Sequence, residues 1–349
     1  MHPRPRSMRA PLALVAAVVL VGAACGDRTE PGADPGGVED PPPEGVSVVA
    51  EGLSGPTQIT EGPDGLVVVA QLNGPESAGT GQVLALDSRT GQRRVLLDEL
   101  DKPTGVLWLD GQLWVMQRRS LLRAEWSGQG LPKDPEVVLG DLPYNGRSEG
   151  TLTALDDSRF LYETSGAISS GEVVDGSGVL WAFDTGTGES TPLATGFKNA
   201  YAHVVRPDGS VLSTEVGDNV EDPPRDELHL LPADSIRGAS DGAEPPDAGW
   251  PGCPPPGDCP GVEGAAATFE RGATPTGVAS VGDRAFIALF VPGSLVEVDL
   301  GGWVPGEPPR RATPVVEGLR GPHTLLARPD GTLWVSEHLA GRIVSVDPG

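Results

Sequence analysis

One short segment recurs along this chain, and the recurrence limits the possible folds more than any other feature. The clearest copy spans residues 318–346, where a Gly-Pro opening precedes three short apolar runs, a Pro-Asp-Gly turn and a Gly-containing loop. Short apolar runs bounded by turn residues predict antiparallel strands joined as a meander. With the position of the opening proline as marker, six copies begin at Pro56, Pro103, Gly150, Ala200, Pro275 and Pro322.

The spacing of these markers predicts the architecture. Successive markers are 47, 47, 50, 75 and 47 residues apart. Repeats of this length, built from short strands, are typical of propeller blades, because one blade cannot bury both of its faces and must stack on neighbours around an axis. A helical solenoid is the competing repeat architecture, but no segment after the N-terminal region shows a sustained helical apolar period. We therefore predict an all-β six-bladed β-propeller, with seven blades as the main alternative.

The N-terminal region has the pattern of a secretory signal. Arg4, Arg6 and Arg9 precede a continuous apolar run over 11–21, which is too short to span a membrane as a helix. Small residues then lead to Cys25, and this ending resembles the lipobox of bacterial lipoproteins. The resemblance implies that residues 1–24 are removed and that a lipid on Cys25 anchors the exported protein to the outer face of a bacterial membrane. A plain secreted protein cut nearby is the alternative.

The segment after the signal has a different composition. Residues 25–45 are mostly Pro, Gly and acidic residues with almost no apolar side chains. Such a segment cannot bury enough surface to fold, so we expect a disordered tether. The propeller is then expected to span residues 46–349.

The charge balance narrows the choice of partners. The chain has 49 acidic and 25 basic residues, and its formal net charge is −24. A nucleic-acid partner is excluded at this stage, because the sequence offers no basic patch to neutralise phosphates. We expect a monomer that binds a small polar molecule.

The one long step between markers contains an insertion, at about residues 232–270. It includes Cys253 and Cys259, in the run GWPGCPPPGDCPG. In an exported protein such a pair predicts a disulfide that closes the loop. A zinc site is the alternative, although no second Cys or His pair lies nearby in the sequence.

Candidate site residues are expected at the mouth of the central channel, where the inner strands and their connecting loops converge. If the Asp-Gly pairs form two-residue turns, counting outward places His323 opposite His338 and Gln58 opposite Gln71. These residues could instead line a wet channel and hydrogen-bond one another. The polar set at this end comprises Gln58, Gln71, Gln117, Tyr201, His203, Glu215, Asp218, His323, Glu337 and His338.

One passage resembles a known family. Residues 196–231, GFKNAYAHVVRPDGSVLSTEVGDNVEDPPRDELHLL, followed by GWPGC at 249–253, resemble the glucose/sorbosone dehydrogenases, which are soluble six-bladed propellers dependent on pyrroloquinoline quinone (PQQ). The wider relatives are TolB-like, NHL-like and gluconolactonase-like propellers. The resemblance implies an oxidoreductase that acts on sugar or aldehyde CH–OH groups, with PQQ and calcium as possible cofactors.

The resemblance also implies site residues. The catalytic candidates are Glu149 and His203. The cofactor-binding candidates are Lys198, Asn199, Tyr201, Gln58, Gln71, His323, Glu337 and His338. The calcium candidates are Gly217, Asp218, Asp226 and Glu227, because calcium prefers such oxygen ligands; a solvated acidic loop is the alternative.

The chain departs from the family pattern at two functional positions. Lys198 stands where the family has an arginine that contacts the quinone, and Arg147 stands where the family's catalytic histidine opens a His-x-x-Gly-x-Leu run. A guanidinium stays protonated and cannot act as a general base, although Glu149 could substitute. We therefore expect a propeller that binds a small polar ligand such as a sugar, with the catalytic base replaced.

Two other function classes stay open. A metal-dependent lyase or lactonase of NHL or gluconolactonase type would use His203, His323 and His338 as ligands, since imidazole is a common transition-metal ligand. Gln58 lies near the position where gluconolactonases carry a glutamate. A non-catalytic binding module that kept only the scaffold is the third class.

Overall fold

The computed structural model describes residues 41–349 except 148, 218–225 and 254–263. The predicted signal peptide, most of the tether and the residues Cys25, Asp218 and Cys259 therefore lie outside the described residues. The helices in the described part of the chain are all too short or too polar to cross a membrane.

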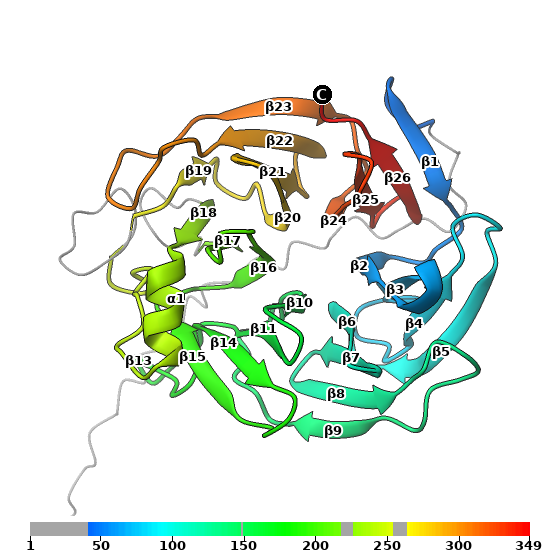
Figure 1. The fold of residues 1–349 in the computed structure, drawn as a ribbon, viewed down its shortest axis with the longest axis horizontal. Helices are drawn as coiled ribbons and strands as arrows, with labels where there is room; N and C mark the ends of the chain where they lie inside the picture. The colour runs from blue at the N-terminus through cyan, green and yellow to red at the C-terminus, as the bar shows by residue number, and fades with distance from the viewer. Residues whose placement is uncertain (1–40, 148, 218–225, 254–263) are drawn as a thin grey trace, which may run out of the picture. The chain divides into compact units, whose positions relative to one another are not determined.

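The chain forms six four-stranded antiparallel sheets arranged as a ring, which confirms the predicted six-bladed β-propeller (Figure 1). In the first five blades the strands follow chain order from the channel outward, and the marker residues lie at the start of the inner strand or up to three residues before it. The first three blades are β2 (Pro56–Glu61), β3 (Val67–Gln71), β4 (Gly81–Leu86) and β5 (Arg93–Leu100); β6 (Gly105–Leu109), β7 (Gln112–Gln117), β8 (Ser120–Glu125) and β9 (Glu136–Leu139); and β10 (Thr153–Ala154), β11 (Arg159–Thr164), β14 (Val179–Asp184) and β15 (Ser190–Ala194).

The other three blades complete the ring. They are β16 (Ala200–Val205), β17 (Val211–Glu215), β18 (Asp226–Leu231) and β19 (Ala267–Phe269); β20 (Pro275–Val281), β21 (Arg284–Leu289), β22 (Ser294–Asp299) and β23 (Ala312–Glu317); and β24 (Pro322–Ala327), β25 (Leu333–Glu337), β26 (Arg342–Val346) and β1 (Val46–Ala50). A small hairpin, β12 (Ile168–Ser169) and β13 (Glu172–Val173), is inserted between β11 and β14. A single 3-10 turn, η1 (Pro63–Gly65), joins β2 to β3.

The last blade takes its outer strand from the start of the fold. β1 pairs antiparallel with β26, with Val46 opposite Val346 and Val48 opposite Val344. This pairing ties the two ends of the ring together and covers the edge that β26 would otherwise expose. The sequence carries only an indirect signal of it: the sixth repeat ends after three strands, and an unassigned apolar segment precedes the first repeat.

The apolar core lies between successive blades. Six clusters of buried side chains fill the spaces between neighbouring sheets of the described chain. Between the second and third blades, for example, the ring of Phe160 lies 4.9 Å from that of Trp114 and 5.1 Å from that of Phe183, centroid to centroid. Because each blade buries its faces against two neighbours, no blade can be displaced without opening a core layer.

The predicted insertion lies between the third and fourth strands of the fourth blade. It begins with the helix α1 (Ala233–Ser240), which packs Ile236 and Ala239 against Leu193 and Ala194 of β15. Cys253 is buried. The disulfide stays a prediction, because Cys259 lies outside the described residues.

The turns correct the predicted hairpin register. The Pro-Asp-Gly segments form three-residue loops, not two-residue turns, as shown by hydrogen bonds that join Arg328 N to Thr332 O and Gly62 N to Leu66 O. A further irregularity near the start of the inner strand shifts the register again. The prediction that Gln58 faces Gln71 is therefore wrong.

In both hairpins the residues that face one another at the mouth differ from those predicted by counting outward from the turn. Gln71 faces Pro56 in the first blade. Glu337 faces Pro322 in the sixth blade, so His323 and His338 are not cross-strand partners.

Candidate functional site

The inner strands carry a repeated threonine one residue after the marker. Thr57, Thr104, Thr151 and Thr276 hold this position in four blades, and all are buried. The hydroxyl of Thr57 donates to Pro103 O at 2.9 Å, and that of Thr276 donates to Pro322 O at 3.1 Å. These bonds tie the inner strand of one blade to the marker residue of the next.

Two blades depart from this pattern. The fourth has Tyr201 and the sixth has His323, and the Tyr201 hydroxyl is hydrogen bonded to His323 Nε2 at 3.1 Å. Both side chains are buried, and the bond joins blades that are not neighbours in the ring. Burial, with smaller contributions from His338 and Lys102, lowers the pKa of His323 well below its usual value, so the imidazole is neutral at neutral pH.

His338 lies against this pair at the mouth. Its ring stacks on that of His323 with centroids 5.6 Å apart and planes 29° apart, and Phe290 packs against both histidines. The two rings are therefore side by side, although they are not cross-strand partners. His338 is half-buried, and its Nδ1 lies 3.2 Å from Pro56 O. Because a carbonyl can only accept, Nδ1 carries the proton and Nε2 is left as an acceptor.

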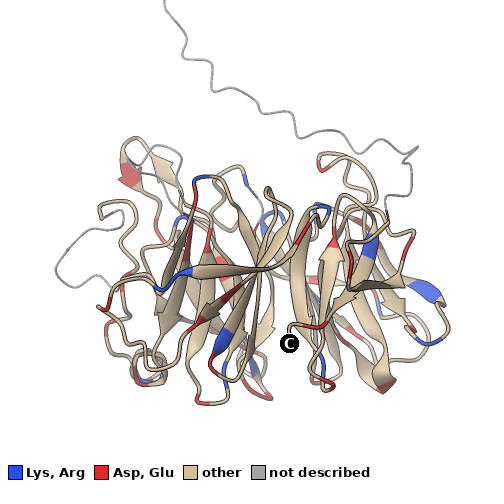
Figure 2. Ribbon diagram, turned by 90° about the horizontal axis from the view of Figure 1, so that it is seen from above, with Lys and Arg blue, Asp and Glu red and all other residues tan. Residues whose placement is uncertain are grey.

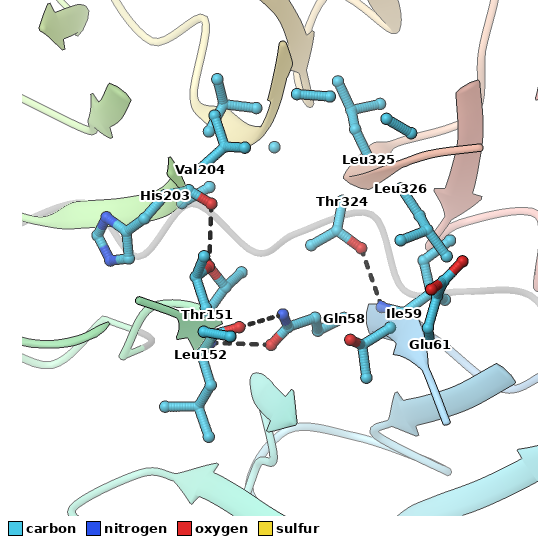
Figure 3. Close-up of a pocket in the computed structure, with 18 of the residues that line it drawn as sticks. Gln58, Ile59, Glu61, Thr151, Leu152, His203, Val204, Thr324, Leu325 and Leu326 are labelled. Carbon is cyan, nitrogen blue, oxygen red and sulfur yellow. Dashed lines mark hydrogen bonds between the residues drawn. The ribbon is translucent and has the colours of Figure 1, made fainter. Parts of the chain in front are cut away.

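Gln58 forms a second bridge across the ring. Its Nε2 donates to Leu152 O at 2.7 Å, and its Oε1 accepts from Leu152 N at 3.0 Å (Figure 3). Its Oε1 also accepts from Val106 N at 2.7 Å. Both polar atoms of this buried amide therefore serve contacts between the first, second and third blades. The structure uses Gln58 as a structural bridge, whereas the sequence predicted a cofactor contact.

Beyond these bridges the channel contains a cavity of about 570 Å³. Its wall is formed by the inner strands, from Gln58 and Thr324 near the bridges to Glu61 and Arg328 at the end where the Pro-Asp-Gly turns lie. Tyr201, His323 and His338 lie towards the other end of the channel and are not part of this wall.

His203 does not join the other two histidines. Its Nδ1 is 3.2 Å from Ser213 Oγ, and Figure 3 shows the ring turned away from the cavity. Burial lowers the pKa of His203 to about 3. Among the described residues the predicted metal site of His203, His323 and His338 is thus not assembled, and His203 is not placed to act on a ligand in the channel.

The ends of four second strands share a structural motif that the sequence did not reveal. Gln71, Gln117, Glu215 and Glu337 each accept, through one side-chain oxygen, the backbone N–H of the residue two positions before the marker of the same blade. The four N···O distances are 2.9, 2.9, 2.6 and 2.6 Å in that order. The predicted cofactor contacts Gln71 and Glu337 therefore position the loops that lead into the inner strands.

The third blade holds a buried pair of carboxyl groups. Glu149 and Glu163 are 0% and 1% exposed, and Ser165 Oγ lies 2.9 Å from Glu149 Oε2 and 3.4 Å from Glu163 Oε1. Asn199 also donates to Glu163. One oxygen of each carboxyl group, Glu149 Oε1 and Glu163 Oε2, has no hydrogen-bond partner in the described structure.

Two adjacent buried carboxyl groups cannot both ionise without a large cost. Burial raises the pKa of Glu149 to about 8, and burial together with the charge of Glu149 raises that of Glu163 well above its usual value. The pair therefore holds protons at neutral pH. Because Glu149 is fully buried, it does not reach a ligand at the mouth, and the structure does not support it as the substitute base.

Gly150 explains how this pair is accommodated. A Cβ at Gly150 would lie 2.4 Å from Tyr201 O and 2.9 Å from Glu163 Cγ. Only glycine fits where the third inner strand approaches the fourth this closely. The marker position, proline in four blades and alanine in the fourth, is thus glycine in the blade that carries the carboxyl pair.

The predicted calcium ligands are engaged in other contacts. Asp226 accepts from Gly217 N at 3.0 Å and from Thr274 N at 2.6 Å, one bond on each carboxylate oxygen. Glu227 Oε2 lies 3.4 Å from His229 Nε2. Asp218 is outside the described residues, so the calcium site stays a prediction.

The fourth blade contains a cluster that the sequence did not single out. His229 Nε2 lies 2.9 Å from Glu215 Oε2 and 3.4 Å from Glu227 Oε2, and all three residues are buried. Burial alone would lower the pKa of His229, but its contacts with Glu215 and Glu227 raise it to about 10. The sequence feature that could have revealed this cluster is the run Glu-Leu-His at 227–229, because alternation along a strand places Glu227 and His229 on one face.

The positions predicted to contact the quinone are already paired. Lys198 Nζ donates to Gly166 O at 3.0 Å and lies 5.1 Å from the centre of the Trp250 ring. Lys102 pairs with Glu76, and Arg342 pairs with Glu337. These cations are engaged in contacts within the protein and are not presented to a carboxylate of PQQ, so these positions as described do not fit the quinone.

Comparison with known proteins supports the fold. A Thermus thermophilus oxidoreductase described as a glucose dehydrogenase matches with a TM-score of 0.70 and 17% identity, over 86% of this chain and 98% of that chain. The PQQ-bound aldose sugar dehydrogenase of Streptomyces coelicolor matches with a TM-score of 0.67 and 17% identity, over 87% and 99%. The soluble aldose sugar dehydrogenase of Escherichia coli, in its apo form, gives 0.63 and 14%, over 87% and 99%.

These likenesses confirm the predicted resemblance at the level of the fold. No protein-family model and no curated protein sequence matches the chain. Figure 2 shows Lys and Arg interspersed with Asp and Glu along the described ribbon. At these identities, function has to be argued from the side chains of this chain.

Replacing Glu149 by Gln keeps the shape of the side chain and removes its ionisation. Because the pKa of Glu149 is raised from 4.5 to about 8, this group stabilises the fold fully below about pH 4.5 and loses that contribution as the pH rises towards 8. In the wild type this group should therefore lower the free energy of unfolding by about 1.4 kcal/mol per pH unit across that range. In the variant this decrease should be absent.

Urea unfolding of the two proteins at several pH values across that range measures the difference. Glu172→Gln, which changes an exposed carboxylate on β13 of the same blade, is the matched control and should keep the wild-type slope. Equal pH slopes for wild type and the Glu149→Gln variant would show that the carboxyl pair does not hold its protons as described.

Proposed function

We propose that this propeller binds a small uncharged ligand rich in hydroxyl groups, such as a sugar, at the channel mouth beside His338. The observation that carries the proposal is the state of this imidazole. It is half-buried, its Nδ1 is fixed on Pro56 O, and its Nε2 is left to accept a hydrogen bond. A ligand hydroxyl is a donor that matches this acceptor.

The electrostatics of the mouth favour an uncharged ligand. Burial lowers the pKa of His338, so its ring is neutral at neutral pH. Lys102 is buried and paired with Glu76, and the carboxyl groups of Glu149 and Glu163 hold protons. A charged ligand would therefore find no unpaired opposite charge among these groups.

Flat ring surfaces next to the acceptor also support a sugar. Phe290 packs against His338 and His323 with ring centroids 5.8 and 6.0 Å apart, and Tyr201 lies 5.5 Å from His323. Sites that combine aromatic surface with a few placed polar groups are typical of small-molecule binding. Three solved structures of the same fold are described as glucose or aldose sugar dehydrogenases, which supports the sugar class by analogy alone.

Replacing His338 by Phe keeps a ring at the mouth and removes the acceptor. We expect the wild type to bind at least one monosaccharide or disaccharide in a calorimetric panel, and the variant to lose at least tenfold in affinity. Glu61→Gln, at the opposite end of the channel, should bind like the wild type.

The control also tells the two ends of the channel apart. Loss of binding in Glu61→Gln with retention in His338→Phe would place the ligand in the cavity and contradict the proposal. Absence of sugar binding by the wild type across the panel would also contradict it.

We further propose that the protein acts on the outer face of a bacterial membrane, held by a lipid on Cys25. The basic, apolar and small-residue order of residues 1–25 supports this location. A Cys25→Ser variant expressed in a bacterium should leave the membrane fraction or accumulate as unprocessed precursor. If the variant fractionates with membranes in mature form, as the wild type does, the lipid anchor is excluded.

A further inference from the structure

The fourth blade shares one half of a motif with three other blades and differs from them in the other half. In each of these blades a Gln or Glu at the end of the second strand faces a residue on the third strand. The facing residue is Gln82 in the first blade, Ser120 in the second and Arg342 in the sixth, each bonded to its partner. In the fourth blade Glu215 faces a second acid, Glu227.

Facing carboxylates on adjacent strands repel one another, and burial strengthens the repulsion. Glu215 and Glu227 are only 5% and 4% exposed. His229, two residues along the same strand face, lies within hydrogen-bond distance of Glu215 and beside Glu227. A protonated imidazole offsets one of the two negative charges, whereas a divalent cation bound by a neutral imidazole offsets both.

The three side chains already converge on one point. His229 Nε2 lies 2.9 Å from Glu215 Oε2 and 3.4 Å from Glu227 Oε2, and one ligand atom from each residue lies within 4.8 Å of the others. Lys198 N holds Glu215 Oε1 at 2.6 Å, which turns Oε2 towards His229. The edge of the Phe197 ring, 5.3 Å away, covers the imidazole. In the described chain this is the single group of three or more such residues with this convergence.

We propose that Glu215, Glu227 and His229 bind a divalent transition-metal ion of the zinc class. Ligand atoms about 2.0 to 2.2 Å from a tetrahedral ion lie roughly 3.3 Å apart, close to the spacing seen here. The imidazole nitrogen selects against calcium, which takes six to eight oxygen ligands. The site shares only Glu227 with the calcium site predicted from the sequence and does not depend on the proposed sugar binding.

A metal ion bound here would hold the segment before the fourth inner strand in place, as well as the two strands that carry its ligands. Glu215 lies on β17 and Glu227 and His229 lie on β18, so the ion would join the two strands where they approach the mouth. Glu215 also holds the backbone of Lys198, which precedes the fourth inner strand. The three protein ligands come from one blade, and the fourth position of a tetrahedral ion would be left for water.

The experiment uses the full chain, stripped of metal with a chelator and then titrated with zinc chloride or calcium chloride. Zinc should bind with a stoichiometry of one and raise the Tm of the wild type by roughly 5 °C or more at saturation. His229→Gln and Glu227→Gln should each lose most of this shift. His203→Gln is the matched control, because His203 is a buried histidine of the same blade that contacts Ser213 and lies outside the cluster, and it should keep the shift.

Using both variants keeps the test decisive if one of them fails to fold. Loss of the zinc-induced shift in either folded variant, with retention in the control, supports the site. An equal shift in wild type and both variants, no zinc binding by the wild type, or a larger shift with calcium than with zinc would overturn it.

Discussion

The hydrogen bonds between inner strands of neighbouring blades are the interaction on which the rest of this structure depends. The hydroxyl of Thr57 holds the second blade at Pro103 O, that of Thr276 holds the sixth at Pro322 O, and that of Thr324 closes the ring at Thr57 O. Each such bond contributes only about 1 kcal/mol net. Their larger effect is on register, because a slip of one residue would turn each hydroxyl away from its partner and move every mouth residue to another face.

The same framework explains why the site consists of departures from the repeat. Where the repeat is kept, as with the threonines and the Gln or Glu that ends the second strand, the side chains serve the loops and the neighbouring blade. Where it is broken, side chains meet partners that the repeat does not supply in other blades: Tyr201 meets His323, and Glu227 meets His229. Glu149 and Glu163 form a third such contact, in the most divergent repeat.

Much of the fold could be predicted from the sequence because the repeat is local. The apolar runs and the Pro-Asp-Gly turns fix a four-stranded unit, and six markers give six blades. The pairing of Val46 with Val346 could not be predicted in this way, because it joins the two ends of the chain and no local pattern encodes it. The predicted register was wrong for a different reason. The Pro-Asp-Gly segment has the same sequence whether its loop contains two or three residues, and the third loop residue, such as Pro329, shifts every strand pair by one.

The site could be predicted only in part. His323 and His338 lie together, as the sequence predicted, and their rings stack. Gln58, Gln71 and Glu337 were polar at the expected end but are used to hold the fold, and periodicity alone cannot separate these two uses. The sequence did not single out Glu163 and His229, because the contacts that set the pKa of each are made with a partner elsewhere in the structure.

The central claim is that Tyr201 and His323, which take the place of threonine in two blades, form a buried contact in which the His323 ring is neutral. NMR of the protein with isotope-labelled histidine rings tests it most directly, with the His323 signals assigned by their absence in His323→Gln. The account predicts that the His323 ring stays neutral, with unchanged ring nitrogen shifts, from about pH 8 down to about pH 5, because burial lowers its pKa well below the usual value. Titration of His323 with a midpoint near its ordinary value of about 6.5 would show that the ring is open to water and would contradict the account.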